Sequence, residues 1–468
     1  MTPTIFGYLF AAAAIACMPA SITTMLGLVL VASLMGGASA ITLNGLGGAS
    51  ITPASLALLF LVLRILLSPV GQFSIVAKAI QQNMFFSIFC LYGAATAFLL
   101  PSVFFHTLNV PPLRAIGGGL FATLPVEFSS QNITTAVYLI GTYLASLSAC
   151  IAYALERREN KLLNTVAIVS WVHIGFGVLD IVLSRIGLRD ALDFFRNAHY
   201  QQLAQDIGGI QRVAGIFPEA SAYATFAFSF LVLNTELWMR NVRPVLTGST
   251  AFALLIMSLL TTSSTAYVSI AIYALLLLVR IYFTPMRLAL GKTLMLGAIA
   301  LIAITVLLVL EVFMPAMSNF LIDILNQLTF QKLHTLSGLQ RTFWAQKGWE
   351  AFWKSDWIGI GAGTFRSSGL LSAVAGSLGA VGLAALAGSV WMILRPMRLV
   401  TYDVQTTGDV ALRSAFAWAA TFTLVPALFS LPSPDPGIIF GIFSGIAVSD
   451  LPTALRAKTI PLASLVRL

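Results

Sequence analysis

The chain has 468 residues, of which 58% are hydrophobic and only 9% are charged, and its mean hydropathy is +0.91. A soluble domain carries roughly a quarter charged residues, so this composition excludes a soluble protein and predicts an integral membrane protein. The formal net charge of +9 comes from Lys and Arg residues dispersed in short loops, which argues against binding to nucleic acid.

Apolar runs long enough to cross the ~30 Å hydrocarbon core of a bilayer recur along the whole chain. They predict an all-α fold, a polytopic bundle of about 12–13 transmembrane helices that forms a single integral membrane domain over residues 1–468. The predicted spans cover residues 4–18, 22–42, 53–67, 84–105, 132–154, 162–184, 216–235, 246–262, 264–283, 292–313, 370–394, 412–430 and 436–449.

Lys and Arg residues concentrate in alternate loops, among them 156–161 and 240–243. The positive-inside rule places these loops in the cytoplasm. The remaining connections are neutral or of mixed charge, and two of them are long, at about 185–213 and 314–369. We expect these two loops outside, which in a bacterium means the periplasmic face of the inner membrane.

Neither long loop has a disordered composition, so each is expected to be ordered and functional. The first predicts an interfacial amphipathic helix over 185–212, with Leu188, Leu192, Phe195 and His199 on one face.

The second long loop combines four of the chain's eight tryptophans with four basic residues, namely Trp344, Trp349, Trp353, Trp357, Arg341, Lys347, Lys354 and Arg366. This composition is typical of a helix that lies in the membrane interface. The helical period places on one face Arg341, Ala345, Gly348, Trp349 and Phe352. A surface helix that only anchors a loop is the alternative.

Arg212 and Glu219 lie seven residues apart where the first long loop enters a span. Ionisable groups in hydrocarbon carry a free-energy penalty of roughly 2.5–3.5 kcal/mol, so these two residues are expected either to form an ion pair or to have a function. Glu219 is therefore a candidate general base for a hydroxyl group. In the alternative interpretation, Glu219 forms a salt bridge that holds the bundle together.

The segment 359–363 reads Gly-Ile-Gly-Ala-Gly but lacks the Lys-Ser/Thr of a phosphate loop. We expect its glycines to allow irregular backbone beside a cavity, and Gly376, Gly379, Gly382 and Gly388 to be helix-packing positions. The four histidines are scattered, so no metal site and no cofactor are expected. His334, seven residues before Arg341, is either a second candidate base or a solvated loop residue.

Several motifs occur together in a fixed order. They are Arg212-x-x-Gly-Ile-Phe-Pro-Glu-Ala-Ser, Thr262-Ser-Ser-Thr-Ala, Leu339-Gln-Arg-Thr-Phe-Trp, Trp357-Ile-Gly-Ile-Gly-Ala-Gly-Thr-Phe and Leu378-Gly-Ala-Val-Gly-Leu. This pattern resembles the bacterial O-antigen ligase and O-antigen or exopolysaccharide polymerase family, over residues 210–395 by motif and over the whole chain by topology.

The resemblance implies a metal-independent, GT-C-like glycosyltransferase of surface polysaccharide synthesis, without a cofactor. Such an enzyme transfers an undecaprenyl-diphosphate-linked oligosaccharide to a sugar hydroxyl at the periplasmic face of the inner membrane. Its expected partners are the lipid-linked glycan, the lipid bilayer, a chain-length regulator and export proteins. In this role the catalytic candidates are Arg212, Glu219, Arg341 and His334, and the substrate-binding candidates are Arg366, Trp344, Lys347, Trp349 and Gly361.

The chain departs from the family pattern after its glycine-rich segment. Family ligases carry a His-Asn pair there, whereas this chain has Ser367-Ser-Gly-Leu-Leu-Ser. The departure favours a polymerase over the alternative, an O-antigen ligase that transfers the glycan to lipid A core. A transporter or flippase of lipid-linked sugars is the other alternative, but it predicts internal repeats, and the sequence has no convincing one.

Overall fold

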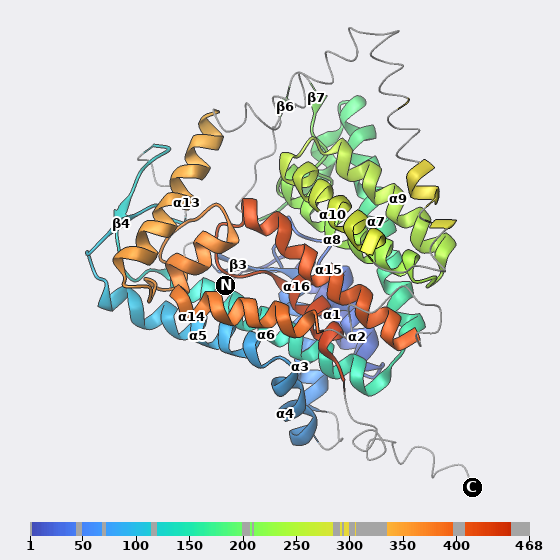
Figure 1. Ribbon diagram of the computed structural model, residues 1–468, viewed down its shortest axis with the longest axis horizontal. Helices are drawn as coiled ribbons and strands as arrows, with labels where there is room; N and C mark the ends of the chain where they lie inside the picture. The colour runs from blue at the N-terminus through green and yellow to red at the C-terminus, as the bar shows by residue number, and fades with distance from the viewer. Residues whose placement is uncertain are drawn as a thin grey trace.

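The computed structural model is a bundle of α-helices joined by loops that contain a few very short strands (Figure 1). It describes residues 2–43, 49–67, 72–113, 119–198, 206–207, 210–283, 291–292, 294–298, 305, 335–395 and 408–450. The helices are α1 (Ile5–Cys17), α2 (Ile22–Ala32), α3 (Pro53–Leu66), α4 (Gln72–Gln82), α5 (Met84–Val103), α6 (Ser130–Glu156), α7 (Glu159–Arg185), η2 (Arg189–Phe195, a 3-10 helix), α8 (Ala220–Met239), α9 (Pro244–Leu260), α10 (Ser264–Phe283), α13 (Leu336–Lys354), α14 (Leu370–Ile393), α15 (Gly408–Ser430) and α16 (Ile438–Val448).

The helices agree with the predicted spans. Every predicted span overlaps helical residues, although 292–313 lies largely outside the described residues and is helical at 292 and 294–298. Six of the described helices are long and apolar enough to cross a membrane, and the shorter apolar helices α1, α2, α3, α9 and α16 accompany them. The prediction of an all-α, polytopic membrane bundle is confirmed.

The strands are two or three residues long, and the sequence analysis did not predict them because an alternating pattern cannot show in so few residues. They are β1 (Thr2–Pro3), β2 (Ile41–Leu43), β3 (Ala49–Ile51), β4 (Asn109–Val110), β5 (Leu124–Pro125), β6 (Asp206–Ile207) and β7 (Ile210–Gln211). β1, β2 and β3 form an antiparallel sheet with Thr2 opposite Thr42 and Ile41 opposite Ile51, while β4 pairs with β5 and β6 with β7.

Close packing in the middle of the bundle depends on glycines of α16. A Cβ at Gly441 would lie 2.5 Å from the Thr142 carbonyl oxygen, and one at Gly445 would lie 2.1 Å from that of Ser146. Small residues let membrane helices approach this closely, so α16 lies directly against α6. α15 packs on it as well, and Figure 1 shows α16 near the centre of the molecule.

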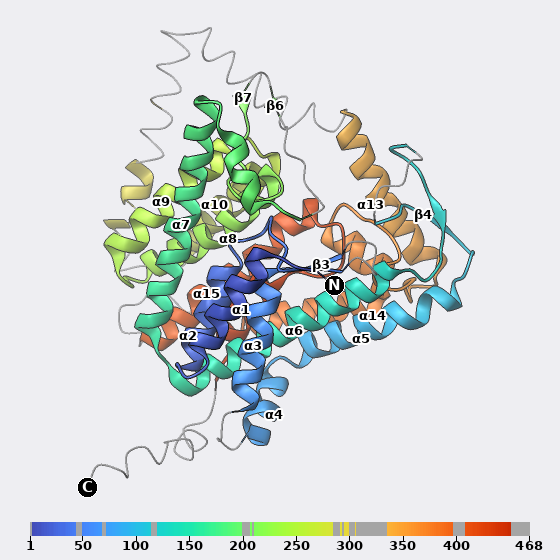
Figure 2. The same ribbon diagram turned by 180° about the vertical axis from the view of Figure 1, so that it is seen from behind.

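The loops predicted to share one side of the membrane do gather at one end of the bundle, which we call the basic end. There Arg157 lies 3.2 Å from Asp409, and Arg243 donates a hydrogen bond of 2.9 Å to Asn160. The described parts of the long loops adjoin the opposite ends of the helices, which we call the site end: η2 follows the last residue of α7, and α13 precedes the first residue of α14. The two loops adjoin different parts of the bundle, because Figures 1 and 2 both show α13 and β4 on one side of the molecule and α7, α9 and α10 on the other.

The predicted interfacial helix at 185–212 is wrong in type and extent. The chain makes a turn at Gly187, with φ +73°, and then forms the 3-10 helix η2. Leu192 is buried at 1% exposure, but Leu188 is 58% exposed, so the predicted apolar face does not form. His199 lies outside the described residues. By contrast, the predicted helix in the second long loop is confirmed by α13, which packs through Gly348 and Phe352.

α14 is broken at Gly379, where φ is 63° and ψ is −156°. The loop before α14 pairs with the interrupted backbone: the Ala380 N–H donates to Trp357 O at 2.8 Å, and the Gly361 N–H donates to Ser377 O at 3.0 Å. Irregular backbone persists in a membrane protein where other protein groups satisfy it in this way. Gly379 therefore breaks the helix, whereas a position in a regular packed helix was predicted.

Candidate functional site

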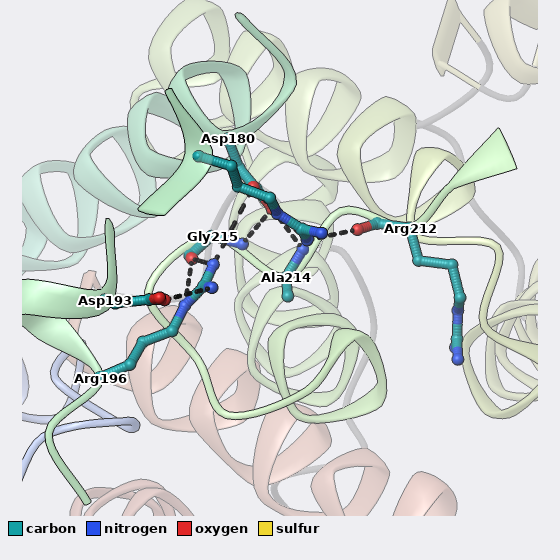
Figure 3. Close-up of polar contacts among 7 residues, drawn as sticks. Asp180, Asp193, Arg196, Arg212, Ala214 and Gly215 are labelled. Atoms are coloured by element: carbon teal, nitrogen blue, oxygen red, sulfur yellow. Dashed lines mark hydrogen bonds and ion pairs between the residues drawn. The ribbon is translucent and has the colours of Figure 1, made fainter. Parts of the chain in front are cut away.

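Residues 212–215, which lead into α8, are held by a buried carboxylate of α7 (Figure 3). Asp180 is 1% exposed and accepts hydrogen bonds from the backbone N–H groups of Ala214 at 2.8 Å and Gly215 at 2.9 Å. It also accepts one of 2.8 Å from Arg189 Nε, and Arg189 Nη2 donates to the Arg212 carbonyl at 3.0 Å. A buried charge needs such partners, and here they fix the backbone beside Arg212.

Arg196 adds a second contact to the same segment. Its Nε donates to the Gly215 carbonyl at 3.1 Å, and its Nη1 lies 3.3 Å from Asp193. Burial lowers the pKa of Arg196, while the nearby Asp180 carboxylate raises it. Two residues after Arg196, the Ala198 N–H donates to Gly37 O at 3.1 Å, so the chain that follows η2 also contacts the loop after α2.

Gly215 has φ +56°, and a Cβ there would lie 2.9 Å from the Tyr223 ring. Gly187 also has a left-handed φ, of +73°, but a Cβ there meets nothing within 4 Å. Both Gly→Ala variants carry the backbone cost of about 1–2 kcal/mol, and only Gly215→Ala adds the clash with Tyr223. We expect Gly215→Ala to unfold at a clearly lower temperature than Gly187→Ala in detergent. Equal unfolding temperatures would contradict the crowding at Gly215.

Arg212, in the first long loop, interacts electrostatically with Arg341 of the second. The pKa of Arg212 is lowered, and burial is the largest cause. The Arg341 charge also lowers this pKa, whereas the Glu219 carboxylate and Tyr267 raise it. The Arg212 Nε also donates to Thr261 O at 3.3 Å, in the turn between α9 and α10. Three of the four predicted catalytic residues are thus close enough to interact, and the fourth, His334, lies outside the described residues.

Arg341 belongs to α13, on the helix face that packs against the bundle. The same face carries Gly348, whose Cβ would lie 2.6 Å from the Ser372 carbonyl oxygen, and the buried Phe352. None of the ion pairs between described residues includes Arg341. Arg341 therefore keeps its positive charge without an ion-pair partner among the described residues, and this charge lowers the pKa of Arg212.

Glu219 is the N-cap residue of α8, and it is partly buried. Its side chain does not cap the helix; instead, the Ser221 hydroxyl donates a hydrogen bond to Glu219 Oε1. Glu219 also lines a cavity of about 1030 Å³. Glu219 therefore borders a space large enough for a substrate and is close enough to Arg212 to raise the pKa of that arginine.

The cavity is bounded mainly by apolar side chains of α3, α6, α8 and α16. Among its described lining residues the acidic ones are Glu219 and Asp435, and none is Lys, Arg or His. Leu59 of α3 and Val137 of α6 line it and are 64% and 59% exposed. Asp435 lies in the proline-rich turn before α16, where burial raises the pKa of its carboxyl group.

Two of the predicted substrate-binding residues stack on each other. The Arg366 guanidinium carbon lies 4.3 Å from the centre of the Trp344 ring, within the range of a cation–π contact. Arg366 is anchored by its backbone N–H, which donates to Pro111 O at 2.8 Å, and Nη1 reaches Leu113 O at 3.5 Å. The pair joins α13, which carries Trp344, to the loop before α14, which carries Arg366.

The other three predicted substrate-binding residues have local roles in the structure. Lys347 pairs with Glu350 at 2.7 Å, so part of its charge is already neutralised. Trp349 is 39% exposed and contacts the Phe352 ring edge-on at 6.0 Å. Gly361 has φ +101°, and a Cβ there would lie 2.8 Å from the Thr96 carbonyl oxygen, so it is required for packing on α5.

The sequence analysis did not identify Asp180, Arg189, Arg196 or Asp435. One signal was present, because Asp180 is an acidic residue inside a predicted span, where charges are usually functional. Within the described ranges, no group of three or more His, Cys, Asp and Glu side chains lies close enough together to hold a metal ion.

Comparison with known proteins leaves the family resemblance without independent support. The chain matches no protein-family model, and no curated protein is similar to it in sequence.

Proposed function

We propose that this membrane protein is a glycosyltransferase that takes an oligosaccharide from a polyprenyl diphosphate and joins it to a sugar hydroxyl. The observation that carries the proposal is that Arg212 interacts electrostatically with a second arginine, Arg341, and with one carboxylate, Glu219. Because the two guanidiniums repel each other, binding of an anion close to both is favoured. Guanidinium binds phosphate through two N–H groups, and a diphosphate is the leaving group of the proposed reaction.

In the reaction, the acceptor hydroxyl oxygen attacks the anomeric carbon of the donor sugar. Glu219 accepts the hydroxyl proton as the new C–O bond forms. The bond between the anomeric carbon and the diphosphate oxygen breaks, and its electron pair leaves with the diphosphate. Arg212 and Arg341 stabilise the negative charge that develops there.

The cavity beside Glu219 supports a lipid-linked donor. Its walls are mainly apolar, exposed residues of α3 and α6 line it, and Glu219, which interacts electrostatically with Arg212, lies on its wall. A hydrocarbon chain that enters from the bilayer would keep its apolar contacts in the cavity while its diphosphate lies at Arg212 and Arg341. We assign the acceptor to a second lipid-linked repeat unit, which makes the protein an undecaprenyl-diphosphate-dependent polysaccharide polymerase.

Purified protein tests the proposal directly when it is given a defined undecaprenyl-diphosphate oligosaccharide. We expect release of undecaprenyl diphosphate together with a glycan of twice the length. Addition of lipid A core as the acceptor separates the ligase alternative, because a ligase would form a core-linked product instead. Vectorial movement of the lipid-linked sugar in vesicles, with no new glycosidic bond, would favour the flippase alternative and contradict the proposal.

We place the site end in the periplasm of a bacterial inner membrane, from the Lys/Arg asymmetry of the loops. Single cysteines at Gln346, on α13, and Asn160, at the basic end, test this in a background in which Cys17, Cys90 and Cys150 are replaced. An impermeant thiol reagent applied to intact spheroplasts should label position 346 and spare position 160. The reverse pattern would refute the orientation.

A further inference from the structure

Asp180 contacts the segment that carries Arg212 but does not line the cavity that holds the proposed donor chain. It lies in the last third of α7, a predicted span, and its side chain is 1% exposed. Ionised carboxylates are expensive at such a position unless several donors stabilise them. Here the donors are Arg189 Nε, the Ala214 N–H and the Gly215 N–H, all within 2.9 Å.

The contacts around Asp180 hold the backbone of three residues within the segment 212–215. Asp180 accepts from the N–H groups of Ala214 and Gly215, Arg189 donates to the Arg212 carbonyl, and Arg196 donates to the Gly215 carbonyl. Figure 3 shows the Arg212 side chain extending away from Asp180, on the other side of this backbone. We call the three side chains Asp180, Arg189 and Arg196 the clamp.

We propose that Asp180 is the positioning residue of the transferase site, an inference that rests on the proposed function. The clamp fixes the backbone direction at residue 212, and with it the place from which the Arg212 guanidinium reaches the diphosphate. Only Ile216, Phe217 and Pro218 separate the clamped segment from Glu219, and Ile216 and Phe217 are 1% and 5% exposed. Because Ile216 and Phe217 are buried, the fixed backbone of residues 212–215 also limits where the Glu219 carboxylate can lie.

Asp180 has a second effect, on charge. Arg189 Nε lies 2.8 Å from its carboxylate and Arg196 Nη2 lies 3.9 Å from it, so the carboxylate offsets positive charge from both. Without Asp180, two further guanidiniums near the entrance would compete for the phosphates of the donor. The clamp therefore both orients Arg212 and keeps the diphosphate site at Arg212 and Arg341.

Hydrogen exchange on the purified full-length protein tests the clamp without reference to activity. In Asp180→Asn we expect the amides of residues 214 and 215 to exchange faster than in the wild type, because the carboxylate that accepts from both is lost. The matched control is Asp190→Asn, which replaces an exposed carboxylate in η2, next to Arg189 of the clamp. Unchanged exchange at 214 and 215 in Asp180→Asn would overturn the clamp.

Binding and transfer measurements test the positioning. We expect Asp180→Asn to bind undecaprenyl diphosphate less tightly and to lose transfer on the order of 10²-fold, as small misplacements of catalytic groups do. Asp190→Asn should match the wild type in both. Because Asp180→Asn removes the carboxylate that pairs with Arg189 and can fail to fold, the charge-balanced variant Asp180→Asn with Arg189→Gln is measured in parallel.

The outcomes separate the two proposals. Faster exchange and normal transfer in either Asp180 variant would overturn the positioning role while leaving the proposed function intact. Conversely, the wild type could bind undecaprenyl diphosphate more tightly than Asp180→Asn does and yet form no glycosidic bond. That result would overturn the proposed function, and the clamp would then position an anion-binding site.

Discussion

Replacing Arg341 with lysine is expected to reduce glycan transfer by roughly 10²–10³-fold, the usual effect of losing one donor that stabilises the transition state. Lysine keeps the positive charge but lacks the planar pair of N–H donors that fits a phosphate. α13 packs through Gly348 and Phe352, so the variant should still fold and insert. The measurement is the initial rate of undecaprenyl diphosphate release at equal amounts of membrane-inserted protein.

The matched control for Arg341→Lys is Lys354→Ala on the same helix. The Lys354 side chain is 58% exposed and pairs with Glu350, so its loss should leave the rate within about twofold. An Arg341→Lys enzyme with an unchanged rate would remove Arg341 from the site. A poorly folded variant would instead assign Arg341 to the packing of α13.

Glu219→Gln is expected to lower transfer by roughly 10²–10⁴-fold, the share that a general base contributes. Glutamine keeps the shape and can still accept from the Ser221 hydroxyl, but it cannot take a proton at neutral pH. Binding of undecaprenyl diphosphate should persist because Arg212 and Arg341 remain. The measurement combines the transfer rate, the binding affinity and the amount of folded protein for the same preparation.

The structural alternative for Glu219 makes a different prediction. If Glu219 held the bundle together through a buried salt bridge, Glu219→Gln would lower the free energy of unfolding by about 3–5 kcal/mol. None of the ion pairs between described residues includes Glu219, so we expect a smaller loss of stability than this. Near-normal transfer by well-folded Glu219→Gln would defeat both interpretations and leave Asp435 and His334 as the next candidate bases.

Local features of the sequence account for most of the fold. The length of each apolar run predicts a span, and Lys/Arg residues at alternate ends predict which loops meet, as Arg243 and Asn160 do. The same reasoning placed Arg212 and Arg341 at one end of the bundle. The sequence did not predict the break of α14 at Gly379. A glycine in an apolar run looks the same in the sequence whether it packs a helix against a neighbour or interrupts the helix.

The site was only partly predictable for a related reason. Asp180 binds two backbone N–H groups, and backbone donors leave no signature in a sequence. Its other partner, Arg189, follows in a segment that was predicted as an amphipathic helix and instead turns back at Gly187. The cavity beside Glu219 depends on several helices at once, so no single stretch of residues predicts it.

The affinity for undecaprenyl diphosphate tests most directly whether Arg212 and Arg341 form a diphosphate site. It is measured by equilibrium titration of wild-type protein, Arg341→Ala and the control Lys354→Ala in the same detergent. Losing hydrogen bonds from one charged group costs about 1.5–3 kcal/mol, so we expect Arg341→Ala to bind about 10–100-fold more weakly and Lys354→Ala to bind as the wild type does. Equal affinity of Arg341→Ala and the wild type would contradict the site.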